Sequence, residues 1–369
     1  MGLRLAAYAW LSLPYDGLVA AMCRFDCGWY ERIAIGGYGA DADWGDYGSY
    51  PHWAFFPLYP LGIAALHQLL AIPALAAGML LSALSLCGFV IVGARYLRDT
   101  RGATYLRDTR GVFHPALWLV LVLLFPYGFF FSAVYTEALF AMVSAGSLLA
   151  LQARRPLLSA GLAALASATR PTGILLTPIL IVDRLAALWR GRHRRDRMAL
   201  AAETLLPIAI APLGLFLYML DQYSRIGDAL AFSHVQRLWH RRWGNPFERI
   251  WSGLETWDFS VLLANPSAAY AASFALLGLA GAIWLALRRR GAEAWFLAGC
   301  ILLPAASGLD SLPRFVATNP VFLFVVYDLA VMLMARRAHP ARLASFAVVL
   351  AALQGVLLIG WFDKAGGVF

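Results

Sequence analysis

The chain has 369 residues, of which 61% are hydrophobic and only 14% are charged, and its mean hydropathy is +0.67. A soluble globular chain has roughly 45–50% apolar and about 25% charged residues, so too few polar side chains remain here to cover a soluble surface. The composition predicts a polytopic membrane protein and excludes a cytosolic enzyme, a disordered chain and a disulfide-stapled secreted domain. The formal net charge of +9 is therefore no sign of a nucleic-acid partner.

Apolar stretches that approach the roughly 20 residues a helix needs to cross a bilayer recur along the chain. Eleven such spans are predicted, which makes this an all-α polytopic membrane protein with a single domain over residues 1–369. The predicted spans cover residues 3–22, 73–94, 112–127, 134–152, 157–169, 171–189, 199–220, 267–287, 292–307, 316–335 and 341–362.

Arginine clusters orient these spans, because cytoplasmic loops collect basic residues. The clusters lie at residues 95–110, 154–155, 190–197, 288–290 and 336–337. All of them share one side only if the apolar stretch 53–70 does not cross the bilayer. That stretch is therefore predicted to be an interfacial helix on the outer leaflet. Two large outer loops result, 23–72 and 221–266, and we expect them to form the active-site face.

The types of basic residue indicate the source of the protein, and the cysteines indicate how they are placed. All 30 basic residues except Lys364 are arginines, a bias that favours a bacterial source and hence a bacterial plasma membrane. Cys23 and Cys27 are four residues apart, a spacing that on a helix usually leaves the sulfurs too far apart to bond. Cys87 and Cys300 lie in apolar runs, which is typical of small buried residues.

The first outer loop carries the strongest candidate segment, Cys-Arg-Phe-Asp-Cys-Gly-Trp-Tyr at residues 23–30, followed by Glu31. Asp26 is either an ordinary interfacial charge or helix cap, or a general base in an aromatic setting. The aromatic segment His-Trp-Ala-Phe-Phe-Pro-Leu-Tyr-Pro at residues 52–60 contains His52 and Trp53. It is either an anchor at the membrane interface or a rigid wall for a lipid-linked substrate.

Further polar candidates lie at the outer ends of later spans. Glu137 is either a charge that stabilises a helix N-terminus or a site residue. Arg170 is either a side chain that reaches lipid phosphate or a site residue. Gln236 and Arg237 belong to a cationic, Trp-rich loop that suits phosphate and sugar or lies on the lipid surface as an amphipathic helix. Arg314 precedes the tenth span on the outer side.

Two carboxylates, Asp16 and Asp328, lie inside predicted spans. Such residues often have a function in the membrane. Neither has an evident partner in its own span, and we expect both to be structural.

Taken together, the motifs resemble the PIG-V family, the GPI second-mannose transferases and their bacterial relatives within the GT-C class of membrane glycosyltransferases. The resemblance runs from about residue 23 to 325. It rests on Phe-Asp-Cys-Gly-Trp-Tyr, Phe-Phe-Pro-Leu-Tyr-Pro, Ser-Ala-Val-Tyr-Thr-Glu-Ala-Leu-Phe, Ala-Thr-Arg-Pro-Thr-Gly, a Gly-Asp…Gln…Trp loop and a late Pro-Arg-Phe. The residue before the Asp is commonly Trp in the family and is Phe25 here, which keeps the aromatic character.

The resemblance implies a glycosyltransferase that uses a polyprenyl-phosphate sugar, usually mannose, on the non-cytoplasmic face, with Asp26 as catalytic base and inversion at the anomeric carbon. Arg170, Arg237 or Arg314 would stabilise the leaving phosphate. The expected substrate-binding residues are Tyr30, Glu31, His52, Trp53, Glu137, Arg170, Gln236, Arg237 and Arg314.

The expected partners are a polyprenyl-phosphate-linked sugar donor, membrane lipids and a lipid, glycan or protein acceptor, without nucleic acid. A bacterial source has no GPI precursor, so the eukaryotic acceptor does not carry over. No cofactor is required, and no motif indicates a divalent metal, although Asp26 with Glu31 or Glu137 would be able to hold one. The alternative functions are a multi-pass transporter or lipid flippase, which tends to have two related halves with broken helices, and a scaffold without catalysis.

Overall fold

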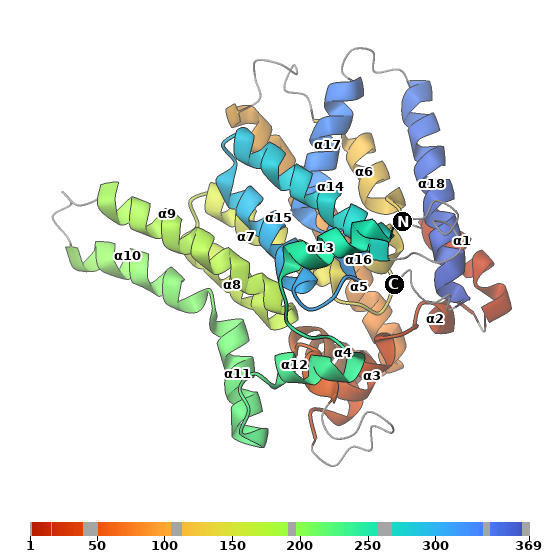
Figure 1. The fold of residues 1–369 in the computed structure, drawn as a ribbon, viewed down its shortest axis with the longest axis horizontal. Coiled ribbons are helices and arrows are strands. Elements are labelled where there is room, and N and C mark those ends of the chain that lie inside the picture. Colours follow the sequence, from red (N-terminus) through yellow and green to blue (C-terminus); the bar gives the residue numbers. More distant parts are fainter. Residues whose placement is uncertain are drawn as a thin grey trace.

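The structure is a computed structural model, and it describes residues 2–15, 17–39, 51–104, 113–190, 197–256, 268–334 and 340–363 (Figure 1). Every regular element in these ranges is a helix. The longer helices are α5 (Ala74–Thr104), α7 (Glu137–Gln152), α8 (Pro156–Thr169), α9 (Leu176–Arg190), α10 (Arg197–Ile210), α11 (Leu213–Ile226), α14 (Ala268–Leu287), α15 (Gly291–Ala305), α17 (Pro320–Met334) and α18 (Pro340–Phe362).

Shorter helices connect these elements. They are α1 (Gly2–Leu11), α2 (Leu18–Ala21), α3 (Cys27–Gly36), α4 (Leu58–Leu70), α6 (Pro115–Leu124), α12 (Ala231–His234), α13 (Pro246–Glu255) and α16 (Leu312–Ala317). Five 3-10 turns complete the described elements: η1 (Leu13–Tyr15), η3 (Pro51–Ala54), η4 (Gly128–Phe131), η5 (Pro171–Leu175) and η6 (Val235–Trp239). In Figure 1, α3, α4 and α12 gather below the bundle formed by the longer helices.

The apolar helices fit a membrane protein, but the predicted count of eleven spans is not confirmed. Among the described residues, four helical stretches are long and apolar enough to cross a bilayer: Ala74–Thr100, Pro171–Arg190, Ala268–Leu287 and Ala341–Phe362. A fifth is added if α10 and α11, which meet at a bend of 49°, form one broken span. Other predicted spans are apolar helices of 10–17 residues, shorter than the roughly 20 residues that a perpendicular span needs.

The first predicted span, residues 3–22, is not one continuous helix. Helix α1 ends at Leu11, a 3-10 turn follows, and α2 begins only at Leu18. Pro14 lies in this break, where its ring fixes one backbone angle and removes an N–H donor. Gly17 has a φ of +86°, a conformation that glycine adopts without steric cost. The predicted interfacial stretch 53–70 forms part of η3 and the separate short helix α4.

Helix α7 is the centre of the bundle and is buried along most of its length, packed between α5 and α8. Small residues permit these close approaches. Ser147 of α7 and Ser159 of α8 exchange hydrogen bonds, each hydroxyl donating to the other residue's carbonyl at 2.9 Å. The packing fixes the start of α7 and the end of α8, and both of these ends carry polar side chains of the site described below.

A buried ion cluster ties α15 to α17. Arg290 forms ion pairs of 3.1 Å with both Glu293 and Asp328, and the Tyr96 hydroxyl donates to Glu293 at 2.5 Å. Arg290, the last residue of the 288–290 cluster, is thus buried, and its charge offsets those of two buried carboxylates. Asp328 finds its partner on another helix, and Asp16 lies outside the described residues.

Candidate active site

A cavity of about 650 Å³ lies where the ends of several helices meet the short elements below the bundle. Its wall comes from the α2–α3 link, η3, the start of α7, the α8–η5 turn, the segment from α12 to residue 243, the end of α15, and α16. The polar and aromatic residues that line it include Asp26, Tyr30, Phe55, Thr136, Arg170, Ser233, His234, Gln236, Trp239, Arg241, Trp243, Ser307, Arg314, Phe315, Thr318 and Asn319.

The loop that carries Asp26 is closed by a disulfide between Cys23 and Cys27, whose Cα atoms are 5.2 Å apart. The prediction that these cysteines are too far apart was wrong because it assumed a helix through both. Instead α2 ends at Ala21 and α3 begins at Cys27, with Phe25 at a φ of +50° between them. A turn at residues 25–26 separates the two helices, the two sulfurs bond across it, and Asp26 lines the cavity.

Tyr135, just before α7, fixes the same loop from the other side. Its hydroxyl accepts a hydrogen bond from the Asp26 N–H at 3.0 Å and donates one to the Arg24 carbonyl at 2.9 Å. The Tyr135 side chain is fully buried, so its hydroxyl is held in place. The backbone of residues 24–26 is thus held by one covalent bridge and two hydrogen bonds.

Four charged side chains form a continuous series of ion pairs, three of them on the cavity wall and Glu137 behind it. Arg170 binds Glu137 at 2.5 Å and donates to the Thr136 hydroxyl at 2.8 Å. Glu137 also lies 3.3 Å from Arg314, which in turn lies 3.5 Å from the Asp26 carboxylate. Glu137 is completely buried, whereas the Asp26 side chain is 36% exposed. Of the two carboxylates in this series, Asp26 is therefore the one that a ligand in the cavity reaches.

Aromatic rings surround the charges. The ring of Phe315 has the guanidinium carbon of Arg170 at 4.6 Å and that of Arg314 at 4.9 Å from its centroid, so cation–π contacts help to place both arginines. Tyr30 lines the cavity beside Asp26. Burial, reinforced by the negative charges of Asp26 and Glu137, raises the pKa of Tyr30, so its hydroxyl is protonated and available as a hydrogen-bond donor.

The structure brings five predicted site residues to the cavity wall: Asp26, Tyr30, Arg170, Gln236 and Arg314. Glu137 lies behind the wall and holds the two arginines. Four others do not line the cavity: Glu31 and Arg237 lie away from it on α3 and η6, and His52 and Trp53 are buried in η3.

His52 and Trp53 support the site indirectly. The Trp53 carbonyl accepts a hydrogen bond from the Tyr218 hydroxyl of α11 at 2.9 Å, which anchors η3. Burial lowers the pKa of His52 to about 4, so the imidazole is neutral near pH 7. A neutral, buried His52 packed beside the Tyr38 and Trp53 rings fits a structural role in the wall.

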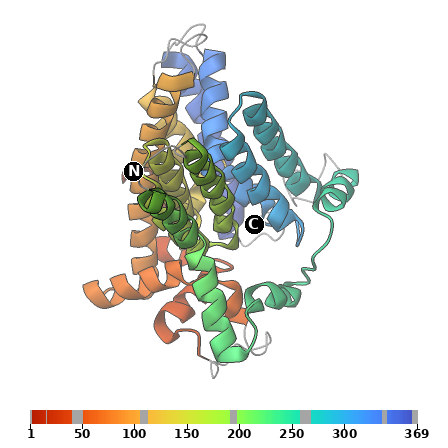
Figure 2. The ribbon, with the colours of Figure 1, turned by 90° about the vertical axis from the view of Figure 1, so that its left-hand side faces the viewer.

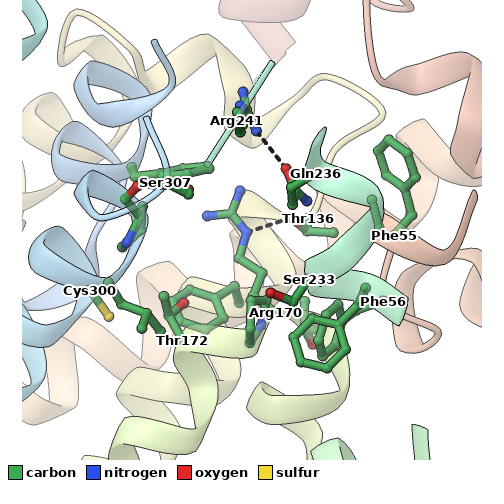
Figure 3. A pocket seen from close by; sticks show the side chains of 18 of the residues that line it. Phe55, Phe56, Thr136, Arg170, Thr172, Ser233, Gln236, Arg241, Cys300 and Ser307 are labelled. Carbon is green, nitrogen blue, oxygen red and sulfur yellow. Dashed lines mark hydrogen bonds between the residues drawn. The ribbon is translucent and has the colours of Figure 1, made fainter. Parts of the chain in front are cut away.

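Several cavity residues of the Trp-rich loop were not among the predicted site residues, and Arg241 and Trp243 are two of them. Arg241 and Trp243 lie in the connection between η6 and α13, which Figure 2 shows running from the lower cluster of helices to the bundle. Figure 3 shows Arg241 and Arg170 entering the cavity from different elements, with Gln236 and Thr136 beside them. The Trp-rich composition of the loop was a usable signal, but composition does not say which of its arginines faces inward.

Metal binding receives no support from the described side chains, among which no group of three or more His, Cys, Asp and Glu residues is placed to hold an ion. Asp26 instead has an arginine beside it. That the reaction requires no metal ion stays a prediction.

Comparison with known proteins gives one family and a set of distant structures. The crystal structure of the Archaeoglobus fulgidus oligosaccharyltransferase in the apo form is 14% identical, with a TM-score of 0.44 over 99% of this chain and 56% of that one. The archaeal oligosaccharyltransferase AglB from the same organism, in complex with an inhibitory peptide and a dolichol-phosphate, is 11% identical, with a TM-score of 0.42 over 100% of this chain and 56% of that one. The present chain thus spans little more than half the length of these proteins. None of the curated proteins matches it.

The sequence itself matches a family model described as Mannosyltransferase (PIG-V) over residues 42–236, more than half of the chain. The matched segment contains Glu137, Arg170 and Gln236, while Asp26 and Arg314 lie on either side of it. The resemblance based on the motifs is confirmed, and the chain belongs to the mannosyltransferase (PIG-V) family.

Proposed function

We propose that this glycosyltransferase moves a mannosyl group from a polyprenyl-phosphate donor to a hydroxyl group of an acceptor, with inversion at the anomeric carbon. The family match supports the sugar and the class of reaction. The observation that carries the proposal is the Asp26 carboxylate, partly exposed on the cavity wall and held 3.5 Å from the buried Arg314.

In the proposed reaction Asp26 acts as general base. The acceptor oxygen attacks the anomeric carbon while its proton passes to Asp26, and the bond between that carbon and the phosphate oxygen breaks. The bonding electrons leave with the polyprenyl phosphate. Because attack and departure occur on opposite faces of the carbon, a single displacement inverts the anomeric centre.

The residues that form the ion pairs with Asp26 and with each other position this base. The Arg314 guanidinium lies 3.5 Å from the Asp26 carboxylate and so helps to hold it at the cavity wall. Glu137 holds both Arg170 and Arg314, so it is a positioning residue and not a group that touches substrate. The hydrogen bonds of Tyr135 keep the Asp26 backbone from moving away from Arg314.

The disulfide supports an extracytoplasmic site. Disulfides persist in oxidising compartments and are rare in the cytosol, and the Cys23–Cys27 bridge encloses Asp26 itself. The site end of the molecule therefore faces the exterior of the membrane in our proposal, where a lipid-linked donor presents its sugar. Glycolipid, glycan and protein hydroxyl groups all fit the proposed chemistry, and a bacterial origin stays a prediction.

Transfer of label from polyprenyl-phosphate [³H]mannose to a membrane lipid extract tests the proposal. Asp26→Asn removes the base at nearly constant volume and is expected to lower the rate about 10²–10⁴-fold. Asp221→Asn is the matched control, since Asp221 also pairs with an arginine and has 37% of its side chain exposed but does not line the cavity.

Unchanged melting temperatures for both variants show that any loss of transfer is not a loss of folding. Normal transfer by Asp26→Asn contradicts the role of this carboxylate. Movement of the labelled lipid across the bilayer without transfer contradicts the enzyme assignment and favours the transporter interpretation.

A further inference from the structure

The charges around the cavity do not balance evenly along its wall. Arg170 and Arg314 are opposed by two carboxylates, Glu137 and Asp26, within 2.5–3.5 Å. These four groups together carry no net charge when both acids are ionised. An anion in the cavity therefore gains little from Arg170 and Arg314, whose fields are largely cancelled nearby.

Arg241 is different. Its Nη1 donates to the side-chain oxygen of the neutral Gln236 at 3.2 Å, and among the described residues no carboxylate lies within ion-pair distance of it. Arg241 lines the cavity together with Gln236. The remaining basic side chain there is His234, whose ring already contacts the Asp228 carboxylate at 2.8 Å. Arg241 is thus the one permanent positive charge on the described cavity wall that lacks a carboxylate beside it.

The segment around Arg241 holds the side chain in place. His240 has a φ of +57°, which turns the chain so that the Arg241 N–H donates to the Gln236 carbonyl at 3.2 Å. On the far side, the Trp243 indole donates to the Ser233 hydroxyl and the Gly244 N–H donates to the Ala306 carbonyl, both at 2.8 Å. The guanidinium group is therefore presented from a fixed backbone, which lowers the entropic cost of binding a ligand.

We propose that Arg241 and Gln236 form the subsite that binds the phosphate ester of the substrate. Arginine matches phosphate oxygens with parallel N–H donors, and the Gln236 amide nitrogen supplies further donors because its oxygen already accepts from Arg241. This inference rests on the proposed function, and it assigns the phosphate to a different arginine from those that position the base. Arg237, one of the three arginines that the sequence offered for the leaving phosphate, lies on η6 and is not among the residues that line the cavity.

The separation of roles follows from the charge that develops in the reaction. A sugar phosphodiester carries one negative charge, and its phosphate gains a second as the bond to the sugar breaks. A cation that is not committed to a carboxylate stabilises this added charge without releasing Asp26 from Arg314. The donor phosphate is accordingly the expected occupant, and the phosphate of a lipid acceptor is the other source of the same chemistry.

Direct binding of dolichyl phosphate and dolichol to the purified protein separates this inference from catalysis. We expect the wild-type protein to bind dolichyl phosphate more tightly than dolichol, and Arg241→Gln to weaken dolichyl-phosphate binding roughly tenfold to a hundredfold while dolichol binding is unchanged. Arg241→Lys keeps the charge but not the planar fork and is expected to fall between the two. Arg242→Gln is the matched control, as the neighbouring arginine is exposed and does not line the cavity.

Kinetics then identify the source of the phosphate. A raised KM for the polyprenyl-phosphate donor in Arg241→Gln, with an unchanged KM for the acceptor, supports the donor subsite. If only the KM for the acceptor is raised, the assignment to the donor is overturned. The phosphate subsite itself is overturned if Arg241→Gln has the same melting temperature as the wild-type protein and binds dolichyl phosphate equally well. If the wild-type protein binds dolichyl phosphate through Arg241 but transfers no sugar, the proposed function fails and the phosphate subsite stands.

Discussion

At the scale of single residues, the site depends on how one short loop is held. Asp26 follows Phe25, which has a positive φ, and such a backbone persists in a non-glycine residue only when its surroundings enforce it. Here the Cys23–Cys27 bridge and the Tyr135 hydroxyl supply that constraint. The closed loop is short, so the bridge adds little stability by restricting the unfolded chain. Its larger effect is on the position of the carboxylate.

Removal of the bridge should therefore lower the rate more than the stability. In Cys23→Ala/Cys27→Ala we expect kcat for mannosyl transfer to fall about tenfold or more, because small displacements of a catalytic group are costly, while the donor KM changes little. Cys87→Ala is the control, since Cys87 is a free cysteine outside the cavity wall. An unchanged kcat in the double variant would show that the hydrogen bonds of Tyr135 are sufficient to hold Asp26.

At the scale of helices, the position of Arg170 depends on the contact between α8 and α11. A Cβ atom on Gly214 of α11 would lie 1.9 Å from the Ala164 carbonyl oxygen and 2.6 Å from the Ala168 nitrogen of α8. The backbones of α8 and α11 thus touch here, and no larger residue fits at position 214 unless one helix shifts. Arg170 caps the C-terminus of α8, so a shift of this helix reaches the site.

Gly214→Ala is accordingly expected to destabilise the protein by about 1–3 kcal/mol, the usual cost of overpacking. The measurement is the melting temperature in detergent, together with the transfer rate at a temperature where the variant is folded. Gly161→Ala on α8 is the matched control, because a Cβ atom there meets nothing within 4 Å. Equal melting temperatures for the two variants would mean that α11 is free to move off α8.

At the scale of the whole molecule, sequence patterns predicted the class of fold and the part of the site that rests on motifs. The all-α character agrees with the prediction, and Asp26, Arg170 and Arg314 line one cavity, while their roles there stay predictions. The cysteine bridge was missed because spacing was interpreted on an assumed helix. Arg241 was not singled out for another reason. An arginine can be identified as lacking a carboxylate partner only once the ion pairs of the other arginines are known, and those pairs join residues far apart in the sequence.

The same long-range arrangement predicts the orientation of the molecule in the bilayer. Figure 1 shows α3, α4 and α12 at the bottom and the end of α14, which precedes the exposed Arg288, near the top. Since basic loops stay in the cytoplasm, the top of this view is expected to face inward and the cavity outward. The Cys23–Cys27 disulfide at the cavity end favours the same orientation, by an argument that does not involve the arginines.

Labelling with a membrane-impermeant thiol reagent in intact cells checks this orientation. In a Cys87→Ser/Cys300→Ser background, Arg242→Cys is expected to react without permeabilisation and Arg288→Cys only after it. The native Cys23–Cys27 bridge does not react with the reagent, so the background protein is the blank. Reaction of Arg288→Cys from outside, with Arg242→Cys protected, would place the cavity on the cytoplasmic face. Asp26 and Arg241 would then be out of reach of a donor in the outer leaflet, and the proposed substrate would have to be replaced by one that cytoplasmic enzymes supply.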